Sequence, residues 1–359
     1  MQLKKIQLLN FKNYEENLLN FSAGINAIVG ANGNGKTNLL DAIHYLCLTK
    51  SAFNSLDSQN IKHGEKFFMI QGIFEKEEKE SEVHCSLQEG KAKTLKVEKK
   101  SYQKISEHIG QFPCVLMTPY DTDLIREGSE IRRKFFDNTL SQIDQIYLIN
   151  LLKYNKLIEQ RNSLLKQFTE RNFFDKTLID TYDTQLLPLA QVIFEKRNEF
   201  ILQFTPILEY YYFFISEGKE KIGMNYLSDL QTPHFEDFFR NQLQKDILLQ
   251  RTTKGIHKDD YEFTIGSYSM NKYGSQGQQK SYVVALKLAQ FELLSKLKGS
   301  KPILLLDDIF DKLDDNRIKK LMELMSEGLF GQVFITDARP ERTKGLFQEI
   351  AQEINLIVI

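Results

Sequence analysis

The chain has 359 residues, and its 47 Lys and Arg against 48 Asp and Glu give a formal net charge of −1. Hydrophobic residues make up 42% and charged residues 26% of the chain. This composition is typical of globular proteins, and it excludes both a disordered chain and a uniformly basic, histone-like protein. The charge balance does not exclude a local basic patch for nucleic acid.

The three cysteines, Cys47, Cys85 and Cys114, form no CxxC pair. We therefore predict reduced, buried thiols and neither a zinc ribbon nor a disulfide framework. The N-terminus does not resemble a signal peptide, and no apolar run is long enough to span a bilayer. We expect a cytoplasmic protein.

The first fifty residues predict strands and then a helix. Residues 3–11 alternate between apolar and polar side chains, and residues 17–21 are typical of a return strand. The apolar run 25–29 indicates a buried strand, and residues 38–48 carry apolar side chains at helical spacing. A glycine-rich turn lies between these last two segments, so strand, turn and helix follow in that order.

Residues 66–119 predict further strands, and among them the segment 91–104 is rich in lysine. A charged strand pair is the favoured interpretation of this segment, with a contact to the DNA backbone as the alternative. Residues 129–188 lack proline before their last position and predict one or two long helices. The helical pattern continues to residue 215, and we expect Pro206 to kink or break it.

The run of aromatic residues 210–214 favours core packing or a helix interface, with base stacking as the alternative. Beyond Gly255 the pattern predicts strands again, followed by a helix over 279–297. An apolar strand at 303–306 and a last strand at 333–335 complete the predicted elements.

The glycine-rich turn has the sequence GANGNGKT and matches the pattern G-x-x-x-x-G-K-[ST] in full. Its glycines allow backbone N–H groups to turn inward and bind phosphate at the start of a helix. In such a site Lys36 reaches the β- and γ-phosphates, and Thr37 binds Mg²⁺. The pattern predicts an ATP site formed by Gly30, Ala31, Asn32, Gly33, Asn34, Gly35, Lys36 and Thr37.

A nucleotide site of this kind also needs an acid on a neighbouring strand. The apolar run 303–306 is followed by Asp307 and Asp308, and successive strand residues point to opposite sides. We predict that Asp307 binds Mg²⁺ through water. Asp308 is then placed to orient or deprotonate the attacking water, which makes Asp308 and Lys36 the candidate catalytic residues.

The segment YGSQGQQKS, residues 273–281, leads into a predicted helix. A Ser-x-Gly-Gln turn offers further N–H groups and a hydroxyl for a phosphate, and we expect Ser275, Gly277 and Gln278 to serve the nucleotide of another subunit. A simple helix cap by Ser275 is the alternative.

With these three motifs in order, the chain resembles the ABC-type ATPase heads of SMC proteins and, more closely, the bacterial RecF family. The resemblance covers essentially the whole chain. It rests on LLNFKNYEE, GANGNGKTNLLDAIHYL, MTPYDTDLIREGSEIRRKFFD, KYNKLIEQRNSLLK, GIHKDDYEF, YGSQGQQKS and LLLDDIFDKLDDNR. A chain of this length has no room for the long coiled coils of SMC proteins.

The resemblance implies an α/β fold, with a P-loop ABC-type ATPase head and a mixed sheet. The head would comprise residues 1–135 and 245–359, with a mainly helical insertion at 136–244. Ser275, Gly277 and Gln278 would form the signature motif, and Leu313 with Asp314 the D-loop at a dimer seam. The implied activity is ATP-dependent dimerisation on duplex or gapped DNA with slow hydrolysis. It would assist the loading of RecA at gaps, together with RecR and RecO.

Several positions depart from the family pattern. Asn54 stands where an arginine is usual, and Asp308 where most ABC ATPases have glutamate, so we expect slow turnover. Thr336 and Asp337 follow the strand at 333–335, where ABC transporters carry a switch histidine. This leaves the γ-phosphate sensor unassigned, and Gln111 is only a weak candidate for the Q-loop.

Candidate contacts to the DNA backbone are Lys91–Lys100 and the run Arg132-Arg133-Lys134, of which the second can equally be structural. Such contacts would be salt-dependent and nearly independent of base sequence. Two other functions remain open from the residues alone. One is a phosphotransferase that uses the same phosphate loop, and the other is a scaffold whose ATP is purely structural.

Overall fold

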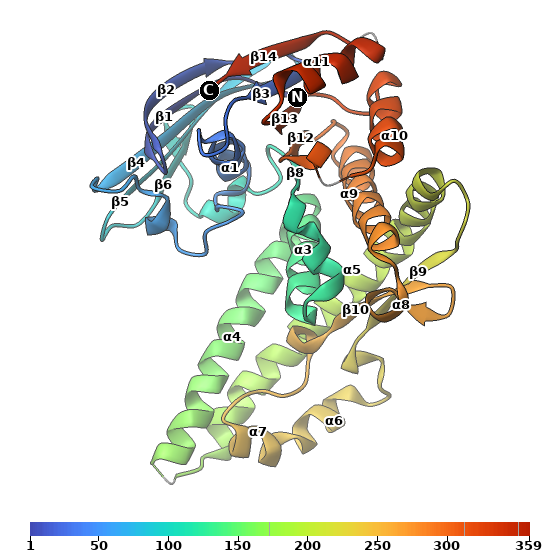
Figure 1. Cartoon of the computed structure of the whole chain (residues 1–359). Coiled ribbons are helices and arrows are strands. Elements are labelled where there is room, and N and C mark those ends of the chain that lie inside the picture. Colours follow the sequence, from blue (N-terminus) through green and yellow to red (C-terminus); the bar gives the residue numbers. More distant parts are fainter. Residues whose placement is uncertain (172, 312, 351) are drawn as a thin grey trace. The chain divides into compact units, whose positions relative to one another are not determined.

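The computed structural model describes residues 1–171, 173–311, 313–350 and 352–359, and the chain divides into two compact units (Figure 1). Unit 1 comprises Met1–Thr122, Tyr210–Gly218 and Lys280–Ile359, and unit 2 comprises Asp123–Glu209 and Lys219–Gln279. The predicted insertion at 136–244 is shorter than unit 2, which starts at Asp123 and extends to Gln279. The difference arises because α3 (Ser129–Ile143) and β10 (Asp260–Ile265) pack together, and the Arg132 guanidinium binds Asp260, so both elements belong to unit 2.

Unit 1 contains an antiparallel sheet in the order β2-β1-β4-β5-β6-β7. Alternate residues of β1 and β4 are buried, as the period-2 pattern of the sequence requires for a sheet with one face on the core. Leu8 lies opposite Ile70 in the register of these two strands. The strands are β1 (Gln2–Phe11), β2 (Tyr14–Asn20), β4 (Phe67–Lys76), β5 (Lys79–Gln88), β6 (Thr94–Val97) and β7 (Lys100–Ser101).

The second sheet of unit 1 is parallel, in the order β14-β3-β13-β12-β8. All residues of β3, β12 and β13 are buried, which explains their continuous apolar runs. The strands are β3 (Ile25–Val29), β8 (Cys114–Met117), β12 (Ile303–Leu306), β13 (Val333–Asp337) and β14 (Ile354–Val358). The α/β class is confirmed, with the parallel and antiparallel strands in separate sheets.

The strand predicted at 333–335 is confirmed as part of β13, but it is not the last strand, because β14 follows it and pairs with β3. Because β13 covers only one edge of β3, the other edge is completed by β14, whose apolar sequence INLIV favours a strand and was overlooked in the sequence.

Helix α1 (Lys36–Leu48) contacts both sheets of unit 1, namely β1, β4 and β5 of the antiparallel sheet and β8 and β13 of the parallel one. Its side chains Leu39, Ile43 and Leu46 are fully buried in this core. The three cysteines are also buried and free, as predicted. The other regular elements of unit 1 are η1 (Asp57–Asn60), η2 (Ile105–His108), η3 (Pro119–Thr122), η6 (Ile309–Asp311), α10 (Asp315–Ser326) and α11 (Pro340–Glu349).

Unit 2 is mainly helical, and it also contains a three-stranded antiparallel sheet, β11-β10-β9. Its long helices are α3, α4 (Gln145–Glu170) and most of α5 (Lys176–Ser216). Its shorter elements are α2 (Asp123–Arg126), β9 (Ile222–Leu227), η4 (Asp229–Gln231), α6 (Phe235–Asn241), α7 (Leu243–Leu249), η5 (Ile256–Lys258), β11 (Tyr268–Ser269) and α8 (Met270–Tyr273). Helix α9 (Gln276–Lys298) begins in unit 2 and continues in unit 1.

Pro206 does not break the helix, since α5 contains both Pro188 and Pro206 and continues to Ser216. Both rings are on the exposed side of the helix, and Phe204 and Leu208 beside Pro206 are fully buried. The packing of these neighbours outweighs the hydrogen bond that the proline removes. Among the helices of the described residues, none combines the length and the apolar character needed to cross a membrane.

Candidate nucleotide site

The phosphate loop joins the end of β3 to the start of α1, as the sequence predicts (Figure 1). Gly33 and Gly35 have φ values of 91° and 105°, in the left-handed region that favours glycine. A Cβ atom at Gly35 would lie 2.4 Å from Asn13 Nδ2, so a side chain has no room there. Because Gly35 is the N-cap residue and offers no side-chain acceptor, the first N–H groups of α1 can serve a bound anion.

Lys36 lies over this loop and is almost completely buried. Its Nζ donates to the carbonyl oxygens of Gly30 at 2.9 Å and Ala31 at 3.1 Å, and it lies 3.5 Å from Asn32 Oδ1. All three acceptors are neutral. Within the part of the chain that the structure describes, the ammonium has no carboxylate partner, which suits its charge to a phosphate.

The turn between β1 and β2 packs against the same loop. Asn13 Nδ2 donates to Asn34 O at 3.2 Å, and the Tyr14 hydroxyl donates to Gly35 O at 3.1 Å. Beside Asn13, the Lys12 ammonium binds the buried Asp41 carboxylate at 2.6 Å. Sequence reasoning did not identify these contacts, although the interruption of the first strand pair at residues 12–14 marks the turn.

The predicted acid strand lies beside the loop, since β12 pairs with β13 and β13 pairs with β3. The Thr37 hydroxyl donates to the Asp307 carboxylate, with its Oγ1 2.9 Å from Oδ1 and 3.1 Å from Oδ2. These residues are 270 positions apart in the chain. The structure thus brings together the two segments that the sequence suggested as halves of one site.

Burial raises the pKa of Asp307 above its usual value. Burial also raises the pKa of Asp308, and the nearby carboxylates of Asp311 and Asp337 add to this effect. Asp308 has a backbone φ of 45°, and its buried Oδ1 accepts no hydrogen bond from the described residues. A left-handed conformation at a residue other than glycine is uncommon and is often found at functional sites.

Thr336, at the end of β13, contacts both acidic residues. Its Oγ1 donates to Asp307 Oδ1 at 2.9 Å and accepts the backbone N–H of Asp308 at 2.8 Å. The sequence showed only that no histidine stands here. The signal that could have identified this threonine is its place directly after an apolar strand of the same parallel sheet, where strand ends meet at one edge.

The neighbouring Asp337 is committed to other partners. Its carboxylate binds Arg342 at 2.6 Å and 3.0 Å and the Thr343 hydroxyl at 2.7 Å. Although burial opposes the effect, these hydrogen bonds lower the pKa of Asp337. Arg342 also binds Asp311 in η6 at 2.6 Å, and it therefore fixes the segment that follows Asp308.

The donors at this edge fit Mg²⁺, which prefers hard oxygen ligands and keeps several waters when it binds with a nucleotide. Thr37 and Asp307 supply a hydroxyl and a carboxylate within hydrogen-bond distance of each other. Within the described ranges, no cluster of three or more His, Cys, Asp or Glu side chains could hold a metal ion by itself. The site suits a metal that arrives with phosphate.

The predicted signature residues belong to unit 2, at the start of α9. Ser275 Oγ accepts the Gln278 N–H at 3.2 Å, and Gln278 Oε1 accepts the Ser275 N–H at 2.7 Å. This reciprocal pair is a capping box. Gln278 Nε2 also donates to Glu220 at 2.8 Å. Ser275 is exposed and Gly277 is half-buried. Ser275 therefore caps α9, as the alternative interpretation predicts, and it is exposed on the surface of unit 2.

The remaining residues that were considered against the family pattern have ordinary structural roles. Asp314 caps α10 by accepting the Arg317 N–H at 3.0 Å, while Lys312 of the same DKLDD segment lies outside the described residues. Asn54 Nδ2 donates to Asn60 Oδ1 at 3.0 Å. Gln111 is exposed in the loop before β8.

The two basic segments are partly structural. Lys93 binds Asp57 at 2.7 Å, and only 9% of its side chain is exposed. Arg132 makes a two-bond contact to Asp260, and Arg133 donates to Asp259 O at 2.6 Å. The charged strand pair is confirmed, since β6 pairs with β7, whereas Lys99 and Lys134 are exposed.

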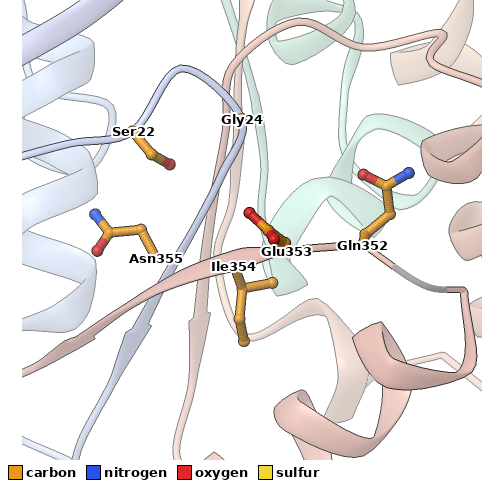
Figure 2. A pocket seen from close by; sticks show the side chains of 6 residues that line it. All are labelled: Ser22, Gly24, Gln352, Glu353, Ile354 and Asn355. Atoms are coloured by element: carbon orange, nitrogen blue, oxygen red, sulfur yellow. The ribbon is translucent and has the colours of Figure 1, made fainter.

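A surface depression of about 680 Å³ lies elsewhere in unit 1, at the start of β14 (Figure 2). Figure 2 shows Glu353 and Asn355 pointing to one side of the strand and Ile354 to the other. Asn355 donates to Asn26 Oδ1 at 2.9 Å, which holds this edge together. Because Ile354 pairs with Ile25, the depression is at the amino ends of the parallel strands. The phosphate loop is at their carboxyl ends, where ligands of open parallel sheets bind.

The RecF/RecN/SMC N-terminal domain family matches residues 2–352. A curated "DNA replication and repair protein RecF" of Cytophaga hutchinsonii is 49% identical over 359 residues, covering 100% of this chain and 95% of that protein. The protein of the same name from Flavobacterium johnsoniae is 47% identical over 352 residues, covering 98% of each chain.

Solved structures agree with these relatives. A structure described as the recombination mediator protein RecF with ATP, in the RecFOR pathway, superposes with a TM-score of 0.88 at 32% identity, covering 94% of this chain and 92% of the other. The Smc head domain of Pyrococcus furiosus has a TM-score of 0.55 at 18% identity, with coverage of 98% and 92%, and it shares the fold. The phosphate loop, the acid strand and these relatives together show that the chain belongs to the RecF family of DNA replication and repair proteins.

Proposed function

We propose that unit 1 binds Mg-ATP and that the bound nucleotide joins two copies of the chain into a dimer that holds duplex or gapped DNA. The observation that carries the proposal is the hydrogen bond between Thr37 and Asp307, which places a phosphate loop beside a carboxylate strand. The solved relative at 32% identity is described with ATP. We extend the proposal to a role in recombination with RecR, RecO and RecA, supported by the RecFOR pathway named for the solved relative.

Each residue of the site has a chemical task in this proposal. Lys36 and the N–H groups of the loop bind the phosphates, Thr37 would bind the metal through its hydroxyl, and Asp307 would hold it through water. When bound, Mg²⁺ would neutralise charge on the nucleotide phosphates. Asp308 orients a water molecule and accepts its proton, and its shorter arm compared with glutamate makes hydrolysis slow.

Dimerisation would bring Ser275, Gly277 and Gln278 of one copy to the nucleotide of the other. A ligand shifts an equilibrium only by binding one state better than the other. ATP contacted from two chains binds the dimer better than the monomer, so it acts as a switch. DNA contacts through the phosphate backbone would then be steeply salt-dependent.

The test is the fluorescence anisotropy of a labelled gapped duplex, titrated with protein at fixed salt with and without Mg-ATP. We expect tight binding only with Mg-ATP, and its loss in the Lys36→Arg and Ser275→Arg proteins. Ser163→Arg, which adds the same charge at an exposed position of α4, is the control and should keep the dependence on ATP. Equal binding with and without nucleotide would contradict the proposal.

A further inference from the structure

Thr336 has no assigned role in the site, although it touches both acidic residues at once. It is fully buried at the end of β13. Its neighbour Asp337 has its carboxylate bound to Arg342 and Thr343, so at this strand end Thr336 is the side chain directed to the acidic pair.

We propose that Thr336 is the positioning residue that sets the geometry of the Asp307–Asp308 pair, and this inference rests on the proposed ATP hydrolysis. The hydroxyl has one proton, and it donates this proton to Asp307 Oδ1. Its lone pairs remain for the Asp308 N–H. One oxygen atom thus orients the carboxylate next to Thr37 and also fixes the backbone of the following residue.

The second contact matters because the chain leaves the sheet at this point. The ladder between β12 and β13 ends with the pair Leu306 and Ile335. Beyond it, the Asp308 N–H is bound by the Thr336 hydroxyl in place of a strand carbonyl, and the backbone turns to a φ of 45°. Such a conformation persists only where surrounding contacts determine it. The hydroxyl therefore fixes the backbone from which the Asp308 side chain extends, next to the carboxylate of Asp307.

The test compares Thr336→Val, which keeps the shape of the side chain and removes the hydroxyl, with Thr336→Ser, which restores the hydroxyl. We expect the valine protein to bind a fluorescent ATP analogue as the parent does, because Lys36 and the loop are intact. Its kcat should fall by about a hundredfold, the effect expected when a reacting group is displaced by about 1 Å. The serine protein should recover most of the rate. Thr139→Val, a buried threonine of unit 2, controls for the substitution itself.

A second readout does not depend on turnover. Without the hydroxyl, the Asp308 N–H loses its acceptor, so hydrogen exchange in a peptide covering residues 305–311 should become faster in Thr336→Val and stay unchanged in Thr336→Ser. Unchanged exchange and an unchanged kcat in the valine protein would overturn the inference. If the parent protein shows no hydrolysis that Lys36→Arg abolishes, the proposed function itself fails, and the exchange measurement still decides whether Thr336 holds Asp308.

Discussion

Two lysines near the phosphate loop differ in what their charges can do, because their partners differ. Lys12 is 10% exposed and is bound to Asp41, whose side chain is fully buried. Asp41 also accepts the Ser51 hydroxyl and the Ala52 N–H. The charge of Lys12 is therefore neutralised within the fold. Lys36 instead donates to neutral oxygens of Gly30, Ala31 and Asn32, and its charge remains for a phosphate.

Two buried histidines predict how stability depends on pH. Burial lowers the pKa of His108 to about 4, and its ring lies 2.6 Å from Leu46 O through Nε2. Burial also lowers the pKa of His257 to about 4. Above pH 6.5 both are neutral in the folded and unfolded chain, so they cause no pH dependence there. Between pH 6.5 and about 4 the unfolded chain binds the extra protons. Each histidine therefore lowers the free energy of unfolding by about 1.4 kcal/mol for every unit by which the pH falls.

The free energy of unfolding, measured in urea from pH 8 to pH 4.5, should therefore fall as the pH decreases below 6.5. The slope should become smaller in His108→Gln, whereas His63→Gln at an exposed position should keep the slope of the parent. A stability that is constant over this range would contradict the burial of these two rings as neutral groups.

At the scale of elements, the two sheets of unit 1 are joined by side chains as well as by α1. Gln332, just before β13, is 1% exposed. Its Oε1 accepts the Leu3 N–H at 2.7 Å, and its Nε2 donates to Leu3 O at 2.8 Å and to Ser22 O at 2.7 Å. One amide therefore connects β1 of the antiparallel sheet to the start of β13 in the parallel sheet.

Replacing this amide should be costly, because the buried N–H and C=O groups of Leu3 lose this partner, whereas Ser22 O keeps its hydrogen bond from Asn26 Nδ2 at 3.0 Å. We expect Gln332→Leu to lower the free energy of unfolding by about 3 kcal/mol, since each unsatisfied buried group costs about 1–3 kcal/mol. Chemical denaturation of the purified protein measures the change. Gln348→Ala, at an exposed position in α11, should stay within about 0.5 kcal/mol of the parent. An equal decrease in the free energy of unfolding in the two variants would show that the Gln332 amide does not stabilise the contact between the two sheets.

At the scale of the whole molecule, each unit has its own interior, and that of unit 2 is partly ionic. Arg161 is fully buried and binds Asp183 at 2.7 Å and Asp246 at 2.8 Å. It also donates to the Thr252 hydroxyl at 2.8 Å. These contacts connect α4 to α5, to α7 and to the loop before η5. Arg197 is also buried and also binds two carboxylates, those of Asp137 and Asp259.

Removal of Arg161 would leave two buried carboxylates without their cation, a change that typically costs about 3–5 kcal/mol. We expect Arg161→Met to speed hydrogen exchange in α4, α7 and the unit 2 part of α5. Exchange in β3, β12 and β13 of unit 1 should stay slow. Arg171→Met at an exposed position should leave both patterns unchanged. Faster exchange spread evenly over the chain would show that the two units unfold as one.

The sequence predicted best where a local pattern is complete. The phosphate loop was predicted residue by residue, because glycine spacing, a preceding apolar strand and a following helix are all local. The acid strand was predicted from its apolar run and its two aspartates. The signature segment was placed at a helix start, and the capping box of Ser275 and Gln278 has the expected local geometry.

The prediction failed where distant segments decide the local structure. Pro206 was expected to kink or break a helix, yet α5 continues because Phe204 and Leu208 are buried against other elements. The apolar segment INLIV at 354–358 was not predicted as a strand although its composition favours one, and its pairing as β14 depends on the distant edge of β3. The lysine-rich run forms the charged strand pair that the sequence favoured, but the ion pair of Lys93 with Asp57 could not be predicted, because it depends on how distant segments pack.

The sequence by itself determined the RecF-like order of motifs, the α/β class and the residues of the phosphate loop, because these depend on neighbours along the chain. Only the tertiary structure decided that Thr37 contacts Asp307, that one Thr336 hydroxyl holds both aspartates, and that Asp337 is bound to Arg342. Each of these contacts joins strand ends that are far apart in sequence. They meet because parallel strands present their carboxyl ends at one edge of a sheet.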